Sequence, residues 1–421
     1  MLLAPAGHPD TTRGLGAVPE TNNLTPRSEP GVTATGDVTL LYVATVSATI
    51  RQFLIPYAAH FRARGWQVHA AANGATTDPA LQGHFDGLHE VPLSRSVLDL
   101  GGWIRGQRAM STLLATRPDI VHVHTPIASF VTRLRSALVP VAHRPAVAYT
   151  AHGFHFHRAG HLAANSVFLA AEKIAGRWTD RLVVINDEDE AAARRHRIVA
   201  PSRLVRMPGI GLDTDYYSRT AIDPTASVAA RRGLGVEAGL PLFLVVGELS
   251  RRKRPGDVVE ALALMRNDRA IVVLVGSGSE RDQVEELARR RGVLHRVHFA
   301  GFLADVRALV VAATAVVLVS DREGLARAIM EALALEVPVI ASTARGNAEL
   351  VEEETGIIVP TADVSGLARA MDWLVEHPIE REAMGRAGRP RMVARYDIRL
   401  LLTRHEEMYA AMLADRAPSA P

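Results

Sequence analysis

Short apolar runs alternate with amphipathic stretches along most of the chain. In the first half the apolar runs lie at 37–46, 66–72, 118–124, 146–152 and 180–186. Continuous runs of this length are typical of strands buried on both faces, and the stretches between them have a helical period, as in 50–65. A regular order of strand and helix predicts a parallel sheet covered by helices.

This rhythm stops at 216–241, which has turn residues and no strand pattern, and then restarts. Apolar runs follow at 241–249, 270–278, 296–302, 315–320, 337–342 and 355–360. The sequence therefore predicts an α/β protein with two tandem doubly wound, Rossmann-like domains that face an interdomain cleft. The predicted parts are a disordered tail (1–36), an N-terminal domain (37–215), a linker (216–240), a C-terminal domain (241–395), a last helix at about 396–413 that packs back on the first domain, and a tail (414–421).

Composition narrows the class of protein without naming its chemistry. The chain has 421 residues, 48 Lys and Arg against 45 Asp and Glu, and no cysteine. The net charge of +3 is too small to indicate nucleic-acid binding, and thiolate catalysis is excluded. Because no apolar run reaches 18 residues and the start lacks a secretory pattern, we expect a soluble cytoplasmic protein.

The candidate chemistry lies at the predicted strand ends, where open α/β sheets bind ligands. The run ending at Ser320 is followed by Glu323, Gly324 and a predicted helix that carries Glu331. Backbone N–H groups at such a helix start can bind a diphosphate, and the two carboxylates can accept hydrogen bonds from the hydroxyls on either side of it. The alternative is a helix-start residue and a solvated helix residue.

Two further strand ends add to this picture. Four cations at 251–254 follow the run 241–249 and could neutralise a diphosphate leaving group, or form a solvated basic turn. Gly276 and Gly278 follow the next run, where the backbone either approaches a ligand or turns tightly.

Several motifs together resemble a known family. In order, VGELSRRKRP, LVGSGSERDQVEELA, VHFAGFLADV, SDREGLARAIMEALA and PVIASTARGNAELVEEETGIIVP resemble the C-terminal domain of family 4 retaining glycosyltransferases, which have the two-domain GT-B fold. In the first half, VHVHTPIAS, YTAHGFHFH, AEKIAGRWTDRLVVINDED and MPGIGLDTDYY resemble a subgroup of bacterial capsule, exopolysaccharide and glycan assembly. The resemblance covers nearly all of 38–395.

The resemblance implies roles for particular residues. Glu323 and Glu331 would be the paired family glutamates, for the donor sugar and the ribose hydroxyls respectively. Lys253, helped by Arg252 or Arg251, would hold the diphosphate. A second set would complete the donor site: His152 lining the sugar, backbone at Gly324 and Leu325, and the turn at Gly276.

The sequence also departs from the family pattern. Family members usually carry Pro at the position of Ala326 and Gly at that of Glu336, and many carry Arg at that of Glu248. The Gly-rich turn common after the first strand is replaced by TVSATIRQF (45–53). These departures put full activity and the N-terminal phosphate contact in question.

Three other patterns have competing interpretations. His122, His124, His152, His155 and His157 lie near strand ends and could bind a metal, but no carboxylate or cysteine has a fitting spacing, so they are expected to shape a pocket or to pack. The acidic pair in DTD (213–215) imitates a metal motif, but its place near the linker indicates turn chemistry.

The third pattern, in 130–144, interleaves Arg133, Arg135 and Arg144 with apolar residues. It could touch an anionic membrane or form a solvated helix face.

We therefore expect a retaining glycosyltransferase of hexosyl or N-acetylhexosaminyl type that uses a UDP-sugar. Its expected acceptor is a lipid-linked or polysaccharide-type glycan, and no metal or other cofactor and no nucleic acid is expected to take part. The rival interpretations are a nucleotide-sugar 2-epimerase on the same fold and a non-catalytic nucleotide-sugar-binding protein.

Overall fold

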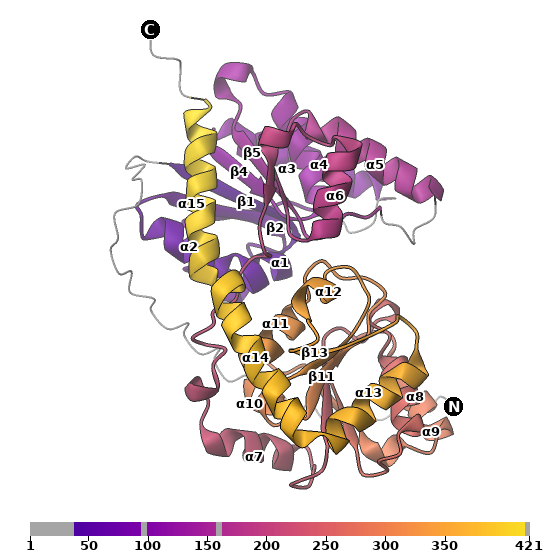
Figure 1. The fold of residues 1–421 in the computed structure, drawn as a ribbon. Helices are drawn as coiled ribbons and strands as arrows, with labels where there is room; N and C mark the ends of the chain where they lie inside the picture. The colour runs from indigo at the N-terminus through magenta and orange to yellow at the C-terminus, as the bar shows by residue number, and fades with distance from the viewer. Residues whose placement is uncertain (1–37, 94–98, 157–161, 417–421) are drawn as a thin grey trace, which may run out of the picture. The chain divides into compact units, whose positions relative to one another are not determined.

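A computed structural model describes residues 38–93, 99–156 and 162–416 (Figure 1). The predicted tail at 1–36 lies outside these residues, as do 417–421. Within them the chain forms two all-parallel sheets with helices on both faces, so the predicted α/β class with tandem Rossmann-like domains is confirmed.

The first sheet has the order β3-β2-β1-β4-β5-β6-β7. Its strands are β1 (Thr39–Val46), β2 (Gln67–Asn73), β3 (Gly87–Glu90), β4 (Ile120–Val123), β5 (Ala146–Ala151), β6 (Arg181–Val184) and β7 (Leu204–Arg206). β1 and β4 are neighbours, with Leu40 opposite Ile120, although two strands separate them in sequence. The strand order reverses between them, which makes their carboxyl ends a natural binding place.

Two helical layers cover this sheet. The helices in this part of the chain are α1 (Ser47–Phe53), α2 (Ile55–Arg62), α3 (Leu100–Ala115), α4 (Pro126–Ala137), α5 (Leu162–Gly176) and α6 (Asp187–His196). Side chains of α1 and α2 share one apolar core with the sheet, and side chains of α3, α4 and α6 share another. The two layers therefore lie on opposite faces.

The second sheet repeats the design with the order β10-β9-β8-β11-β12-β13. Its strands are β8 (Leu242–Val246), β9 (Ile271–Val275), β10 (Val297–Gly301), β11 (Ala315–Leu318), β12 (Val339–Ser342) and β13 (Gly356–Val359). Each predicted apolar run in this half contains one of these strands. The order reverses between β8 and β11, so the segments that follow these strands meet at one edge.

The helices of the second half also form two layers. They are α7 (Pro224–Gly233), α8 (Pro255–Leu264), α9 (Arg281–Arg290), α10 (Arg307–Val311), α11 (Arg327–Ala334), α12 (Asn347–Leu350), α13 (Val364–Glu376) and α14 (Pro378–Tyr396). α8, α9 and α13 pack on one face of the sheet, and α10, α11 and α14 pack on the other. The final helix, α15 (Ile398–Ala414), places Leu401, Tyr409 and Met412 in the core of the first domain.

The structure differs from the predicted elements in three places. β3 and β7 were not predicted, because these short edge strands are only partly buried and show no apolar run. The helix predicted at 50–65 is two helices that meet near Leu54, one residue before the Ile55–Pro56 start of α2. The predicted linker contains α7, and Arg231 of this helix donates hydrogen bonds to the carbonyls of Ala312 and Leu240 in the second domain.

Candidate active site

Glu323 lies between two cations just beyond β11. The Lys253 Nζ atom is 2.6 Å from the Glu323 Oε1 atom, and the Arg252 Nη1 atom is 3.1 Å from the same oxygen. Arg252 also donates to the carbonyl of Arg322 at 2.9 Å. The side chains of Lys253 and Glu323 are only 16% and 10% exposed, so the cluster has a net positive charge in a partly desolvated place.

Lys253 comes from the turn after β8, where residues Arg251–Lys253 form one 3₁₀ turn. Its Cε atom lies 3.8 Å from the position that a Cβ at Gly247 would occupy, so its stem crosses the end of β8. The chain has only two lysines, Lys173 and Lys253, against 46 arginines. Arg251, also predicted for this site, is exposed and takes part in no ion pair among the described residues.

Gly324 brings loops of the two domains into contact. A Cβ atom built on Gly324 would lie 2.1 Å from the backbone oxygen of His152, so no larger residue fits there without movement. Leu325 follows, and its Cδ1 atom lies 3.3 Å from a Cβ built on Gly209. These contacts place the segment after β11 directly against the segments that follow β5 and β7.

The helix after this segment starts later than predicted. Its first residue is Arg327, with Ala326 at the N-cap, so Gly324 lies in the preceding loop and is not at the helix start. No side chain caps this end of α11. The uncapped backbone N–H groups, together with the positive end of the helix dipole, suit an anion.

Gly276 and Gly278 allow the loop after β9 to touch the loop after β8. Both have a left-handed φ, +136° and +159°, and added Cβ atoms would lie 2.0 Å from the Gly247 oxygen and 2.2 Å from the Leu249 oxygen. The structure therefore explains both glycines by close backbone packing, which was the simpler of the two interpretations.

Glu331 lies on α11 and is buried, contrary to the alternative of a solvated helix residue. The Arg327 Nε atom is 2.7 Å from its Oε1 atom, and the Arg327 Cζ atom lies 5.9 Å from the centroid of the Tyr217 ring. Burial and the Glu331 carboxylate raise the pKa of Tyr217 above its usual range. Neither Arg327 nor Tyr217 was singled out from the sequence, although Arg327 precedes Glu331 by one helical turn.

His152 follows β5 and is part of a cluster of rings. Its Nε2 atom lies 3.3 Å from the Nδ1 atom of His124, and its ring stacks on Phe53 at a centroid distance of 5.8 Å. Burial lowers the pKa of His152 to about 4, so the imidazole is neutral near pH 7. A neutral ring can both accept a hydrogen bond and donate one.

Sequence reasoning missed Arg345, which follows β12 and reaches both domains. Its Nη1 atom is 2.9 Å from the Oδ1 atom of Asp189 on α6, and its Nη2 atom donates to the carbonyl of Phe154 at 3.2 Å. Its Nε atom donates to the carbonyl of Glu323 at 3.3 Å. The signal available in the sequence was a lone cation directly after an apolar run, at the same sheet edge as the other candidates.

Backbone geometry accounts for two of the departures from the family pattern. Ala326 has a φ of −77°, which lies within the range that proline fixes. Alanine here therefore has the backbone conformation that the proline of other family members would have. Glu336 has a φ of +60°, directly after the C-cap of α11, where glycine is favoured. Glu248 is exposed beside the cationic turn.

The histidines predicted near the strand ends form hydrogen bonds with other side chains. His122, fully buried on β4, lies 2.5 Å from the Tyr409 hydroxyl and 2.7 Å from the Thr150 hydroxyl. Among the described residues, no group of three or more His, Cys, Asp or Glu side chains could hold a metal ion. His157 lies outside those residues.

In the DTD motif, Asp213 accepts hydrogen bonds from the backbone N–H groups of Asp215 and Tyr216, which is turn chemistry as predicted.

Arg133 fits neither interpretation of the basic pattern at 130–144, whereas Arg135 and Arg144 are half-buried. The Arg133 side chain is only 1% exposed, because it pairs with Glu172 at 2.9 Å and lies over the Tyr149 ring, with its Cζ atom 4.4 Å from the ring centroid. It therefore faces neither a membrane nor solvent. The sequence pattern could not show this, since a buried partner 39 residues away has no local signal.

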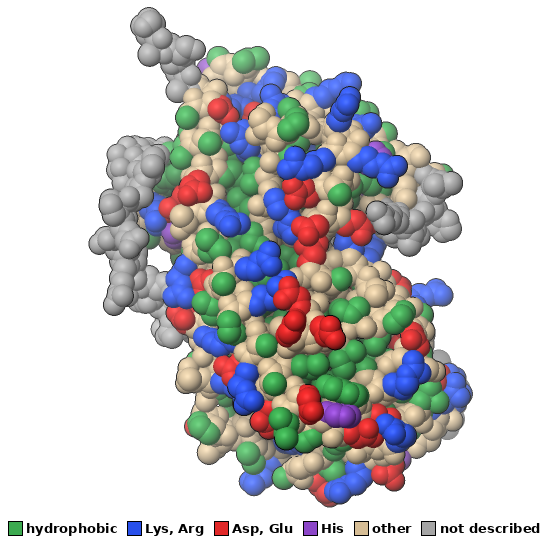
Figure 2. All heavy atoms as spheres, in the orientation of Figure 1, with side chains coloured by type: hydrophobic (Ala, Val, Ile, Leu, Met, Phe, Trp, Pro, Cys, Tyr) green, Lys and Arg blue, Asp and Glu red, His purple; other side chains and the backbone are tan. Residues whose placement is uncertain are grey.

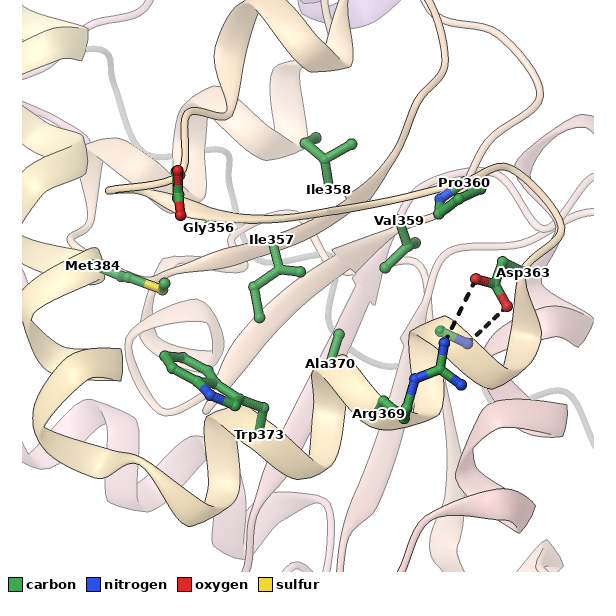
Figure 3. Close-up of a pocket in the computed structure, with 12 residues that line it drawn as sticks. Gly356, Ile357, Ile358, Val359, Pro360, Asp363, Arg369, Ala370, Trp373 and Met384 are labelled. Atoms are coloured by element: carbon green, nitrogen blue, oxygen red, sulfur yellow. Dashed lines mark hydrogen bonds and ion pairs between the residues drawn. The ribbon is translucent and has the colours of Figure 1, made fainter.

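A hollow of about 640 Å³ lies elsewhere in the second domain, between the edge strand β13 and α13 (Figure 3). Ile357, Ala370, Trp373 and Met384 form its apolar wall, and Asp363 and Arg369 lie at its other end, their side chains 4.0 Å apart. None of the predicted site residues lines it. The charged groups that suit a phosphate are thus in the loops and not in this hollow.

Comparisons with known proteins agree with this arrangement. Residues 53–215 match the sequence model of the family described as Glycosyltransferase Family 4, and residues 229–391 match that described as Glycosyl transferases group 1. The chain is 30% identical over 354 residues to the putative glycosyltransferase EpsD of Bacillus subtilis, covering 83% of this chain and 91% of that protein. It is 24% identical over 304 residues to the UDP-Gal:alpha-D-GlcNAc-diphosphoundecaprenol alpha-1,3-galactosyltransferase of Escherichia coli, covering 71% and 76% of the two chains.

Solved structures share the fold. HepE of Anabaena in complex with UDP superimposes with a TM-score of 0.73 at 20% identity, covering 89% of this chain and 100% of the other. Sucrose-phosphate synthase of Thermosynechococcus elongatus superimposes with a TM-score of 0.76 at 22% identity, covering 90% of this chain and 100% of the other. The two-domain arrangement of parallel sheets is therefore a known one.

Proposed function

Because the chain belongs to family 4 of the glycosyltransferases and has the GT-B fold, we propose that it transfers a hexosyl or N-acetylhexosaminyl group from a UDP-sugar, with retention of configuration. The proposed acceptor is a lipid-linked or polysaccharide-type glycan. The cluster of Lys253, Arg252 and Glu323 carries the proposal, since it offers net positive charge beside an uncapped helix start.

The choice of donor and acceptor draws on similar proteins. HepE is described in complex with UDP and with UDP-glucose, which supports a uridine donor. The name of the Escherichia coli relative contains UDP-Gal and a diphosphoundecaprenol acceptor, which supports a sugar chain built on a lipid diphosphate.

In the proposed reaction the sugar–phosphate bond breaks as the acceptor hydroxyl attacks the same face of the sugar. The acceptor proton passes to the departing phosphate oxygen, so the products are the glycoside and UDP. Lys253 and Arg252 stabilise the negative charge on the leaving diphosphate, helped by the N–H groups of α11. Glu323 is held by both cations, which disfavours a covalent role and favours hydrogen bonds to sugar hydroxyls.

Other residues would complete the donor site. We propose that His152, neutral near pH 7, lines the sugar, and that Glu331 accepts from the ribose hydroxyls. Backbone at Gly324 and Leu325 would contact the sugar and phosphate, and Arg251 and the turn at Gly276 would border the diphosphate. With this many fixed positive groups, we propose that neither a metal ion nor another cofactor is needed.

The test is thermal unfolding of the purified protein with UDP, GDP, ADP and their sugar conjugates. A ligand at 100 times its dissociation constant should stabilise the fold by about 2.7 kcal/mol. We expect a shift with the uridine series only, lost in Lys253→Ala and Glu331→Ala. Lys173→Ala is the matched control, because it removes the one other lysine, which is exposed on α5. A shift with no nucleotide would overturn the donor site.

Turnover separates transfer from the alternatives. With the preferred UDP-sugar and a diphosphate-linked acceptor, we expect UDP release that persists in EDTA. Donor binding without any product would contradict the proposed transferase activity, and loss of activity in EDTA that Mg²⁺ restores would contradict metal independence.

A further inference from the structure

The outer surface of α3 and α5 combines exposed apolar side chains with unpaired cations. α4 packs against both helices and lies between them. On α5, Val167 and Ile174 are 67% and 45% exposed, and Arg177 continues the same helical stripe. On α3, Ile104 is 56% exposed next to the exposed Arg105. We call these residues, together with Arg108 and Lys173, the basic apolar face.

Acidic residues are nearly absent from this region. Between residues 100 and 137 and between 162 and 177, the sequence contains only Asp119 and Glu172. Glu172 is buried against Arg133, and Asp119 accepts from the backbone N–H of Thr39, beyond the C-terminal end of α3. Asp99, the N-cap of α3, accepts from the backbone N–H of Gly102 and forms no ion pair with the exposed cations, so among the described residues no carboxylate of these helices pairs with them.

The cations of the face also lack internal partners. Among the described residues, Arg105, Arg108, Lys173 and Arg177 take part in no ion pair, whereas both Arg281 and Arg289 on the exposed helix α9 pair with acids of the same helix. Figure 2 shows blue and red side chains over the region where α4, α5 and α6 overlap in this view. Among the described residues no carboxylate pairs with these cations, so the face has a positive potential.

The face rests on a firm base. Arg133 on α4 pairs with Glu172 on α5 and donates to Thr179, just after that helix. This buried contact fixes the two helices relative to each other. The apolar side chains above it are consequently presented on a rigid surface, and apolar groups that remain exposed on a well-packed helix layer indicate an interaction site.

We propose that the basic apolar face binds an anionic membrane surface. Cations near such a surface contribute about 1 kcal/mol each, and partly inserted Ile and Val side chains add the apolar part. Charge complementarity selects this partner: in the part of the chain that the structure describes, the face has no exposed acid with which to pair the cations of a second copy or of a basic protein. No helix of the described residues is long and apolar enough to span a bilayer, so the binding would be peripheral.

The test is sedimentation of the full chain with vesicles, without nucleotide, so that it does not depend on the proposed donor. One set is pure phosphatidylcholine and the other has equal parts of phosphatidylcholine and phosphatidylglycerol. We expect binding to the anionic set only, weakened by added salt. Arg105→Glu with Arg108→Glu should lower the partition coefficient by about thirtyfold or more, and Val167→Ser with Ile174→Ser should lower it by about tenfold.

Matched controls lie in the second domain. Val228→Ser with Ile379→Ser changes two exposed apolar residues, and Arg290→Glu changes an exposed cation on α9, all far from this face in the fold. These should bind vesicles like the wild type. Equal binding to both vesicle sets, no binding, or equal loss in the control variants would overturn the proposal. A change of oligomeric state in the face variants would also overturn it, because it would indicate a protein interface.

Discussion

Arg345 and Asp189 form a buried ion pair between the second domain and the first. Their side chains are 7% and 1% exposed, and 2.9 Å separates the Nη1 and Oδ1 atoms. Arg345 also donates to carbonyls on both sides, those of Phe154 and Glu323. One guanidinium thus connects the loop after β5, helix α6 and the loop after β11, which together hold His152 and Glu323.

Breaking this pair should cost stability. Arg345→Gln leaves a buried carboxylate without its cation, and such losses cost about 3–5 kcal/mol. Urea unfolding of Arg345→Gln, Asp189→Asn and the double variant measures the coupling between the two groups. The double variant should be more stable than the sum of the single losses predicts. Strict additivity would show that the two side chains do not interact in solution.

Gly324 should tolerate no side chain. In Gly324→Ala the added methyl group meets the His152 oxygen, and relieving that clash must separate the loops after β5 and β11. We expect about 1–3 kcal/mol less stability and at least about tenfold weaker donor binding, measured by urea unfolding and calorimetry.

The control for this change is Gly233→Ala. Gly233 is the last residue of α7 and has no atom within 4 Å of an added Cβ. Because alanine favours helix over glycine, this variant should match or exceed the wild-type stability by up to about 1 kcal/mol. Equal behaviour of the two variants would refute the crowding argument at Gly324.

Glu336→Gly should stabilise the protein. Glu336 has the left-handed backbone that follows a helix end, which costs a residue with a Cβ roughly 1–2 kcal/mol. Glycine removes this strain but has a more flexible unfolded chain, so we expect a net gain of about 1 kcal/mol. Glu336→Ala keeps the Cβ and should gain nothing. Equal thermal stability of the two variants would mean that the charge, not the backbone, decides.

Acid should destabilise the first domain through its buried imidazoles. Burial lowers the pKa of His152 and of His405 to about 4, and lowers that of His122 and His124 well below 6.5. The unfolded chain therefore takes up protons first as the pH falls. Stability is full above about pH 6.5 and declines toward pH 4, by roughly 3 kcal/mol for each fully shifted group.

This prediction is checked by urea unfolding between pH 7.5 and pH 5. His405→Gln removes one buried imidazole of α15 and should flatten the decline, whatever its stability at pH 7.5. His143→Gln, at an exposed position, should leave the slope unchanged. A wild-type slope in His405→Gln would exclude His405 as a contributor.

The sequence predicted most of the fold because both sheets are parallel and buried. Strands such as β4 and β9 have every residue covered, so their apolar runs stand out. β3 and β7 were not predicted because they are partly exposed edge strands, and such strands need no continuous run of apolar residues. The single helix predicted at 50–65 is two helices in the structure, because the apolar period continues across Leu54 although α2 starts anew at Ile55–Pro56.

The candidate site was predicted as a set of residues but not as a network. The order of the motifs along the sequence predicted that Lys253, Arg252, Glu323 and Gly324 lie at one edge of the sheet, and the structure has them there. It could not show that Tyr217 packs beside the Arg327–Glu331 pair, or that Arg133 is buried, because such contacts depend on packing between distant segments.

Helix α15 also determines the order in which the two domains can complete their folding during synthesis. Tyr409, in the last turns of α15, contacts His122, and Leu401 and Met412 fill the core under β1. During synthesis the strands of the first domain emerge before those of the second, yet part of one face of their sheet stays uncovered until α15 has left the ribosome. The first domain is therefore completed only after the second has been made, and a chain cut short before residue 398 keeps an exposed apolar surface.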